Sequence, residues 1–187
     1  MGYNAVMLYI EDTYEVDNQP YFGYLRGRYS QKELKEIDSY ANEKGMEFIP
    51  CIQTLAHLNA LMHWPQYIDM RDCEDILCAG DEKVYKLIED IFASLDKVLT
   101  SRTINIGMDE AYLMGRGRYM DINGACDRTE ILINHLKRVA DIAVRYDFTL
   151  LVWSDMFFRL ATGTHYGEGE LNPEIRNMIP ENVRLVY

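Results

Sequence analysis

Two adjacent acidic residues, Asp109 and Glu110, follow an apolar segment in the stretch TINIGMDEAYLMGRGRY at residues 103–119. Neighbouring carboxyl groups shift each other's proton affinity, so that one of them can stay protonated at neutral pH and act as a general acid. In a purely structural interpretation, Glu110 caps the next segment and Asp109 pairs with an arginine. The pair is therefore a candidate site for proton transfer.

Other apolar segments of the chain also end in residues that can do chemistry. These are Glu11 and Asp12 after residues 4–10, His57 a few residues after 46–52, and Trp153 and Asp155 at the end of 148–153. Each of them alone has an ordinary alternative role as a helix cap or a core side chain. Together at one rim they favour a sugar site, because an aromatic face stacks on the C–H groups of a sugar and carboxylates bind its hydroxyls.

Short apolar segments alternate with amphipathic ones along the chain. The apolar segments are rich in Val, Ile, Leu and aromatic residues, which predicts strands buried on both faces at 4–10, 46–52, 103–108, 148–153 and 183–187. Capping residues and one-sided apolar patterns predict helices at 30–45, 81–99, 127–146 and 172–178.

This alternation predicts parallel strands joined by right-handed crossovers, as in a doubly wound sheet or a (β/α)₈ barrel. The barrel is favoured because the strand-to-helix connections are long and no GxGxxG motif follows the first strand. The predicted fold class is α/β, a partial (β/α)₈ TIM barrel with about five parallel strands and four helices. A closed barrel has eight of each in roughly 250 residues. We therefore expect residues 1–187 to form a single incomplete domain that lacks the first and last barrel strands.

Side-chain alternation places the acidic pair within this fold. If Ile104, Ile106 and Met108 face the surrounding helices, then Asp109 faces the barrel axis and projects into its mouth. Glu110 lies just beyond the strand, where a turn can bring it over the same pocket.

Composition excludes several classes of partner. The formal net charge of −11 argues against nucleic acid and anionic membranes, and no apolar run reaches the roughly 18 residues that span a membrane. The cysteines lack zinc-site spacing, so no metal or cofactor is predicted; they are Cys51, Cys73, Cys78 and Cys126. The cysteine usage and the lack of a visible signal peptide favour a cytoplasmic location.

The segments LYIED, AHL, INIGMDEA and VWSD, in this order, resemble the β-N-acetylhexosaminidases of glycoside hydrolase family 20. MDEAYLMGRGRY and VWSDMFFRL are similar to the bacterial exo-acting branch, and the resemblance covers essentially the whole chain. Met108 departs from the family pattern, where many members carry Gly. The family arginine that grips sugar hydroxyls has no counterpart here, and we expect Arg116 and Arg118 to be loop residues without that role.

The resemblance implies retaining hydrolysis of terminal β-linked GlcNAc or GalNAc, in which the 2-acetamido oxygen of the substrate attacks the anomeric carbon. It implies that Glu110 is the general acid, that Asp109 orients the acetamido group, and that His57 hydrogen-bonds near the acid. The remaining implied site residues are Glu11 or Asp12 holding that histidine, Trp153 as a wall of the acetamido pocket, Asp155 either close to the sugar or holding a loop, and Tyr187 close to the sugar.

Two alternatives stay open at this point. One is a retaining glycosidase with a protein nucleophile. The other is a catalytically inactive barrel fragment that acts at most as a weak sugar-binding module or self-associates through exposed strand edges. The expected partner is an oligosaccharide or glycoconjugate with a terminal N-acetylhexosamine.

Overall fold

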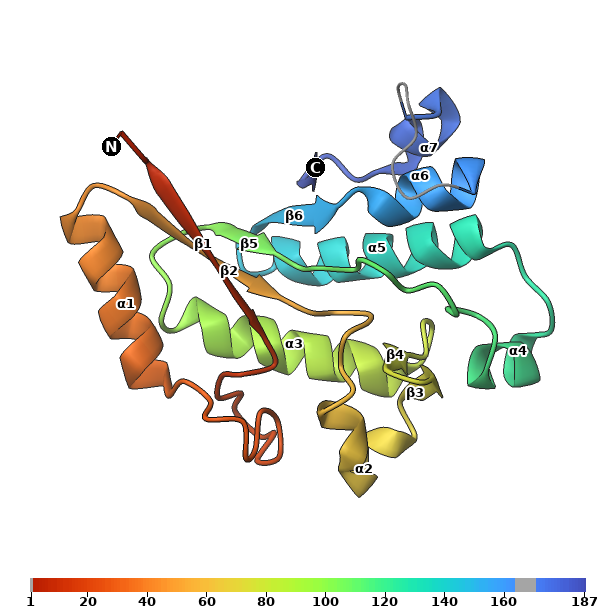
Figure 1. Cartoon of the computed structure of the whole chain (residues 1–187), viewed down its shortest axis with the longest axis horizontal. Helices are drawn as coiled ribbons and strands as arrows, with labels where there is room; N and C mark the ends of the chain where they lie inside the picture. Colours follow the sequence, from red (N-terminus) through yellow and green to blue (C-terminus); the bar gives the residue numbers. More distant parts are fainter. Residues whose placement is uncertain (1, 164–170) are drawn as a thin grey trace.

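The computed structural model describes residues 2–163 and 171–187, and its centre is a five-stranded parallel sheet (Figure 1). The strands are Ala5–Glu11 (β1), Glu47–Ile52 (β2), Thr103–Asn105 (β5), Thr149–Trp153 (β6) and Val183–Val186 (β7). Their spatial order, β1-β2-β5-β6-β7, is also their order along the chain. A doubly wound sheet reverses its strand order at a switch point, so this uninterrupted order is that of a barrel wall.

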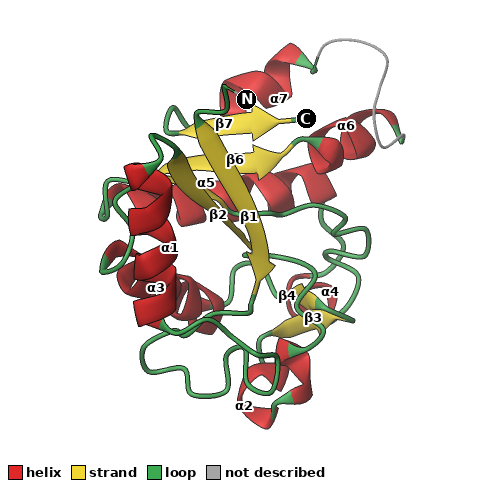
Figure 2. Cartoon of the chain, turned by 60° about the vertical axis from the view of Figure 1, so that its left-hand side comes forward, coloured by secondary structure: helices red, strands yellow, loops and turns green. Residues whose placement is uncertain are grey.

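Four helices connect the strands as the sequence predicts. They are Gln31–Glu43 (α1), Glu82–Asp96 (α3), Arg128–Val144 (α5) and Pro173–Met178 (α7). Ser30 and Glu33 form the predicted capping box at the start of α1, and Asp127 accepts hydrogen bonds from two backbone N–H groups at the start of α5. Helices α1, α3 and α5 cover one face of the sheet (Figure 2). The main core lies between this face and the helices.

The connections at the carboxyl ends of the strands contain further short elements, so the prediction of four helices was too low. The additional elements are Leu61–His63 (η1), Pro65–Ile68 (α2), Arg118–Asn123 (α4), Asp155–Thr162 (α6) and an antiparallel hairpin of Arg71–Cys73 (β3) and Ile76–Leu77 (β4). Most of them are too short to show a periodic apolar pattern. None of the described helices is long and apolar enough to cross a membrane.

The strand predicted at 103–108 is shorter in the structure and ends at Asn105. Gly107 and Met108 have φ angles of 71° and 68°, which lie in the left-handed region and break the extended conformation. The chain nevertheless stays beside its neighbours, because Ile106 donates a backbone hydrogen bond to Leu151 at 2.9 Å. The turn after β5 therefore begins inside the predicted strand, two residues before the acidic pair.

The loop after the acidic pair is held by structural contacts. Asp72, which is buried in β3, accepts hydrogen bonds from the backbone N–H groups of Gly115 at 2.6 Å and Tyr119 at 2.8 Å. Arg118 pairs with Asp81 at 2.6 Å. Arg118 was predicted to lie in a loop, but it is the first residue of α4, and its ion pair with Asp81 is a structural contact.

Candidate active site

The acidic pair and His57 meet at the carboxyl ends of β2 and β5. Nε2 of His57 lies 3.2 Å from Oδ2 of Asp109 and 3.8 Å from Oε2 of Glu110. The contact between Nε2 and Oδ2 of Asp109 is close but is not a hydrogen bond. Nε2 has no hydrogen-bond partner among the described groups. One imidazole therefore lies within 4.0 Å of both carboxylates, the arrangement that a proton-transfer site needs.

Left-handed backbone is concentrated at this rim. His57, Met108 and Glu110 have φ angles of 58°, 68° and 51°, and Glu11 at the end of β1 has 48°. The left-handed conformation costs a residue with a Cβ atom about 1 kcal/mol or more of conformational energy, and such residues are frequent at functional sites. The local strain allows two successive residues, Asp109 and Glu110, to present their side chains toward the same imidazole.

Gln53 holds the side chain of Asp109. It directly follows β2 and is fully buried, and its Nε2 donates a hydrogen bond to Oδ1 of Asp109 at 2.8 Å. Its Oε1 accepts one from the backbone N–H of Met108 at 3.3 Å. Sequence analysis missed this residue. A glutamine directly after the apolar segment FIPCI was the available signal.

Asp155 holds the backbone of Glu110. Its Oδ2 accepts a hydrogen bond from the N–H of Glu110 at 3.0 Å, and the residue is only 3% exposed. Burial raises the pKa of this carboxyl group, and the bond from Glu110 opposes the rise. Asp155 was predicted to lie close to the sugar or to hold a loop, and in the structure it holds the backbone of Glu110 and also lines the pocket beside the acidic pair.

A pocket of about 250 Å³ opens beside the acidic pair. Five residues predicted from the sequence line it, namely Asp109, Glu110, Trp153, Asp155 and Tyr187, together with Ser154 and Val186. Trp153 and Tyr187 thus supply two aromatic residues to the lining of one pocket. The predicted sugar-site residues after β5, β6 and β7 come together here.

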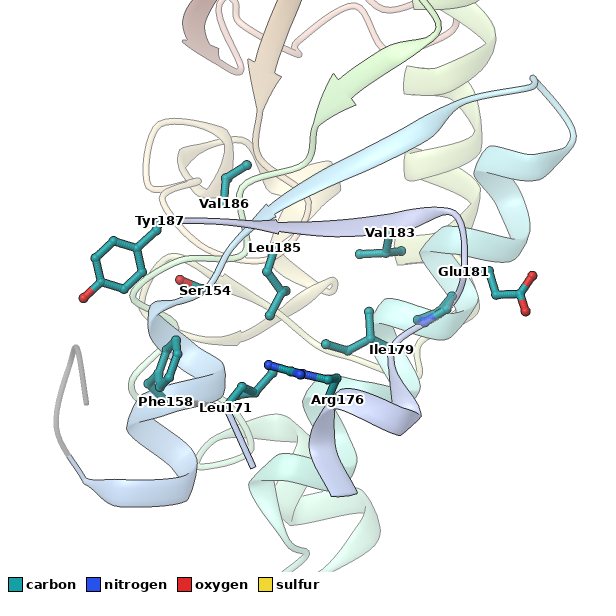
Figure 3. Close-up of a pocket in the computed structure, with 11 residues that line it drawn as sticks. Ser154, Phe158, Leu171, Arg176, Ile179, Glu181, Val183, Leu185, Val186 and Tyr187 are labelled. Atoms are coloured by element: carbon teal, nitrogen blue, oxygen red, sulfur yellow. The ribbon is translucent and has the colours of Figure 1, made fainter. Parts of the chain in front are cut away.

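A larger groove of about 580 Å³ lies alongside, between β7, α6 and α7 (Figure 3). It shares Ser154, Val186 and Tyr187 with the smaller pocket, and its other lining is mainly apolar. Neither acid of the pair lines the groove. The smaller pocket is therefore the candidate site despite its size.

Glu11 and Asp12 do not hold His57, contrary to the relay that the resemblance implies. Both carboxylates pair with the guanidinium of Arg26, at 2.9 Å for Glu11. Asp12 is buried, and burial raises its pKa while Arg26 opposes the rise. The loop after β1 folds back and brings Arg26 to the end of this strand. The guanidinium of Arg26 therefore forms ion pairs with Glu11 and Asp12, which were predicted to contact His57.

Buried polar contacts anchor the segment that leads to His57. His135 of α5 is fully buried, with Nε2 3.0 Å from the carbonyl oxygen of Thr54 and Nδ1 3.1 Å from the hydroxyl of Tyr85. Burial lowers the pKa of His135 to about 4, so the ring is neutral at physiological pH. Within residues 2–163 and 171–187, no group of three or more His, Cys, Asp or Glu side chains is placed to hold a metal ion.

Solved structures share this fold. The β-N-acetylhexosaminidase of Bacteroides fragilis matches 97% of this chain and 38% of its own, with a TM-score of 0.71 and 19% identity. The exo-β-N-acetylglucosaminidase of Vibrio harveyi, solved in complex with N-acetylglucosamine, matches 97% of this chain and 33% of its own, with a TM-score of 0.71 and 14% identity. At such identities the likeness shows the fold alone, and it confirms the predicted partial barrel.

Sequence comparison identifies the family. Human hexosaminidase D is 28% identical over 171 residues, which cover 83% of this chain and 34% of the human protein. The chain thus spans about a third of the length of that relative. The model of the glycosyl hydrolase family 20 catalytic domain matches residues 11–168. That match includes Asp109, Glu110 and His57, and the chain belongs to glycosyl hydrolase family 20.

Proposed function

We propose that the pocket beside Asp109 and Glu110 hydrolyses terminal β-linked N-acetylhexosamine from oligosaccharides or glycoconjugates. The observation that carries this proposal is the position of His57 Nε2, 3.2 Å from one carboxylate and 3.8 Å from the other. The hexosaminidase relatives support the choice of sugar, as does the N-acetylglucosamine bound to the Vibrio harveyi enzyme. No metal or cofactor takes part in the proposed reaction.

The proposed chemistry uses the substrate as its own nucleophile. Glu110 donates its proton to the glycosidic oxygen while the acetamido oxygen attacks the anomeric carbon, so that the glycosidic bond breaks and an oxazolinium ion forms. Water then attacks the anomeric carbon and gives a proton back to Glu110. The two displacements retain the anomeric configuration. An intramolecular nucleophile of this kind gains up to roughly 7–11 kcal/mol from proximity in ideal cases.

Asp109 has a separate part in this scheme. Its carboxylate accepts the acetamido N–H and stabilises the positive charge that develops on the ring being formed. In this scheme Trp153 borders the acetamido group, and Tyr187 lines the same pocket. The side chain of Glu110 is 52% exposed, so water and the leaving group can reach it.

A direct experiment measures release of 4-nitrophenol from its β-GlcNAc glycoside, by this chain and by a version extended to a complete barrel. Hydrolysis by the extended version supports the assignment, and hydrolysis by both means that residues 1–187 suffice. No hydrolysis by either version would overturn it.

The mechanism has its own test against an enzyme nucleophile. A thiazoline that mimics the oxazolinium ion is expected to inhibit competitively, and the corresponding β-glucoside, which lacks the acetamido group, is expected not to be cleaved. Cleavage of the glucoside at a similar rate would favour a protein nucleophile.

The exposed edge of the sheet supports a second candidate role, self-association. β1 and β7 are the outer strands, and Val6, Met7 and Tyr9 of β1 are exposed. An uncovered apolar edge strand favours pairing with another chain. Size-exclusion chromatography tests this role, since a stable monomer at high concentration would count against it.

A further inference from the structure

We propose that Gln53 is a positioning residue that holds the carboxylate of Asp109 oriented to receive the N–H of a 2-acetamido group. This inference rests on the proposed function and deepens it. Gln53 is fully buried directly after β2, with its side chain between the acidic turn and the hydroxyl of Tyr9. Its amide contacts three groups, at 2.8 Å (Oδ1 of Asp109), 3.3 Å (the N–H of Met108) and 3.4 Å (Tyr9).

The surroundings fix which way the amide points. The backbone N–H of Met108 can only donate, so the atom of Gln53 that faces it at 3.3 Å must be the oxygen. The nitrogen then faces Asp109 and donates to it. A neutral amide in this orientation favours the ionised carboxylate, because it offers a hydrogen that a protonated carboxyl oxygen accepts less well.

Gln53 makes the two adjacent acids different from each other. Asp109 has the amide on one oxygen and the His57 ring on the other. The carboxylate of Glu110 lies farther from His57, at 3.8 Å. Asp155 accepts a hydrogen bond from the backbone N–H of Glu110 and does not contact its carboxylate through that bond. Two carboxyl groups in such different settings can divide the roles of ionised acceptor and proton donor. The amide therefore supplies the asymmetry that the proposed mechanism requires.

The turn that carries Asp109 is shaped around the same amide. A Cβ atom on Gly107 would lie 2.1 Å from Oε1 of Gln53, so only glycine leaves room for the side chain. The backbone of the next residue, Met108, is in the left-handed region with φ 68°. The N–H of Met108 donates the hydrogen bond that Oε1 of Gln53 accepts. Gln53 thus fixes both the backbone before Asp109 and the carboxylate itself.

A neutral side chain matters here because titratable groups already surround Asp109 on every side. They are Glu110 after β5, His57 and Cys51 on or after β2, Asp155 after β6, and Tyr9 with its partner Glu11 on β1. A carboxyl group in place of the amide would share a proton with Asp109. The reaction would then need a higher pH to keep Asp109 ionised.

The test compares Gln53→Glu and Gln53→Met with the wild type in the form of the protein that hydrolyses 4-nitrophenyl β-GlcNAc. For Gln53→Glu we expect the acid limb of the kcat/KM profile to move to higher pH by about one unit or more. For Gln53→Met we expect kcat to fall roughly 10- to 100-fold. KM should change less, because the contact of Asp109 strengthens as positive charge develops.

Gln31 provides a matched control. Its Nε2 donates to Oδ1 of Asp17 at 2.9 Å, away from the acidic pair, so Gln31→Glu and Gln31→Met should leave the pH profile and kcat unchanged. Thermal unfolding shows whether each variant is folded, and Gln53→Glu decides the matter if Gln53→Met unfolds. An unshifted profile with kcat within twofold of an active wild type would overturn this inference alone. A wild type without activity would overturn the proposed function and this inference with it.

Discussion

The buried carboxylate of Asp155 accepts a hydrogen bond from the backbone N–H of Glu110 at 3.0 Å. Asp155 begins α6 and Glu110 follows β5, so this bond joins two neighbouring strand ends. Glu110 has a φ angle of 51°, a conformation that needs such support. The position of the proposed general acid therefore depends on a residue outside its own loop.

Replacing Asp155 by alanine is expected to lower kcat roughly 10- to 100-fold, because Glu110 loses the acceptor that fixes its backbone. Asp155→Asn keeps an acceptor oxygen and should lose less. Steady-state kinetics on 4-nitrophenyl β-GlcNAc measure both effects, with Asp141→Asn on the exposed face of α5 as the control. Equal activity of Asp155→Ala and wild type would contradict the supporting role.

Asp155→Asn is expected to stabilise the fold at neutral pH while it reduces activity. The folded state raises the pKa of Asp155 above its usual value near 3.8, mainly through burial, so the ionised carboxylate costs stability at pH 7. The cost disappears as the pH falls through the raised pKa toward the usual value, because the group is then protonated in both states. Thermal unfolding should show a higher midpoint for the variant at pH 7 and no advantage at pH 3. A lower midpoint at pH 7 would contradict this account.

Gly107→Ala is expected to destabilise the protein by about 3 kcal/mol, because a Cβ atom would meet Oε1 of Gln53 at 2.1 Å and the carbonyl oxygen of Ile52 at 2.7 Å. Gly45→Ala is the matched control, since φ is 70° there against 71° at Gly107 and nothing lies within 4 Å of its Cβ position. The control should lose only about 1 kcal/mol for the left-handed backbone. Equal losses in urea denaturation would show that crowding at Gly107 is unimportant.

His135 is expected to make the fold sensitive to mild acid. Burial lowers its pKa from the usual 6.5 to about 4, so the unfolded chain binds a proton in this range that the folded protein does not. Stability should fall as the pH drops from 6.5 to 4, by up to about 3 kcal/mol. His135→Gln removes this contribution and should flatten the dependence in urea denaturation. His63→Gln, an exposed histidine, should leave it unchanged.

The parallel α/β architecture and the acidic pair could be predicted from the sequence because their signals are local. The capping box of Ser30 and Glu33 and the apolar runs of the strands depend only on neighbouring residues. The pair Asp109–Glu110 is visible because it breaks an apolar run. Trp153 and Asp155 were placed at the same rim by the rule that parallel strands share a direction.

Gln53 and Arg26 could not be predicted because their roles depend on the three-dimensional arrangement of strands. The pairing of Cys51 with Asn105 between β2 and β5 brings Gln53 beside the turn at Gly107, and a single sequence does not specify that register. Arg26 captures Glu11 and Asp12 through a loop that folds back over β1. The end of β5 was predicted too late, because methionine rarely adopts a left-handed φ angle and its presence at position 108 does not indicate one.

The most direct test of the central claim replaces each member of the acidic pair in the active protein. Glu110→Gln is expected to lower kcat for an unactivated chitobiose substrate about 10²- to 10⁴-fold, and Asp109→Asn about 10²- to 10³-fold. Glu36→Gln on α1, whose carboxylate pairs with Lys32 at 3.7 Å, should have no effect. Loss of activity in both site variants, with the control unchanged and all proteins folded, is the result that this account predicts. Near wild-type turnover in Glu110→Gln would contradict it.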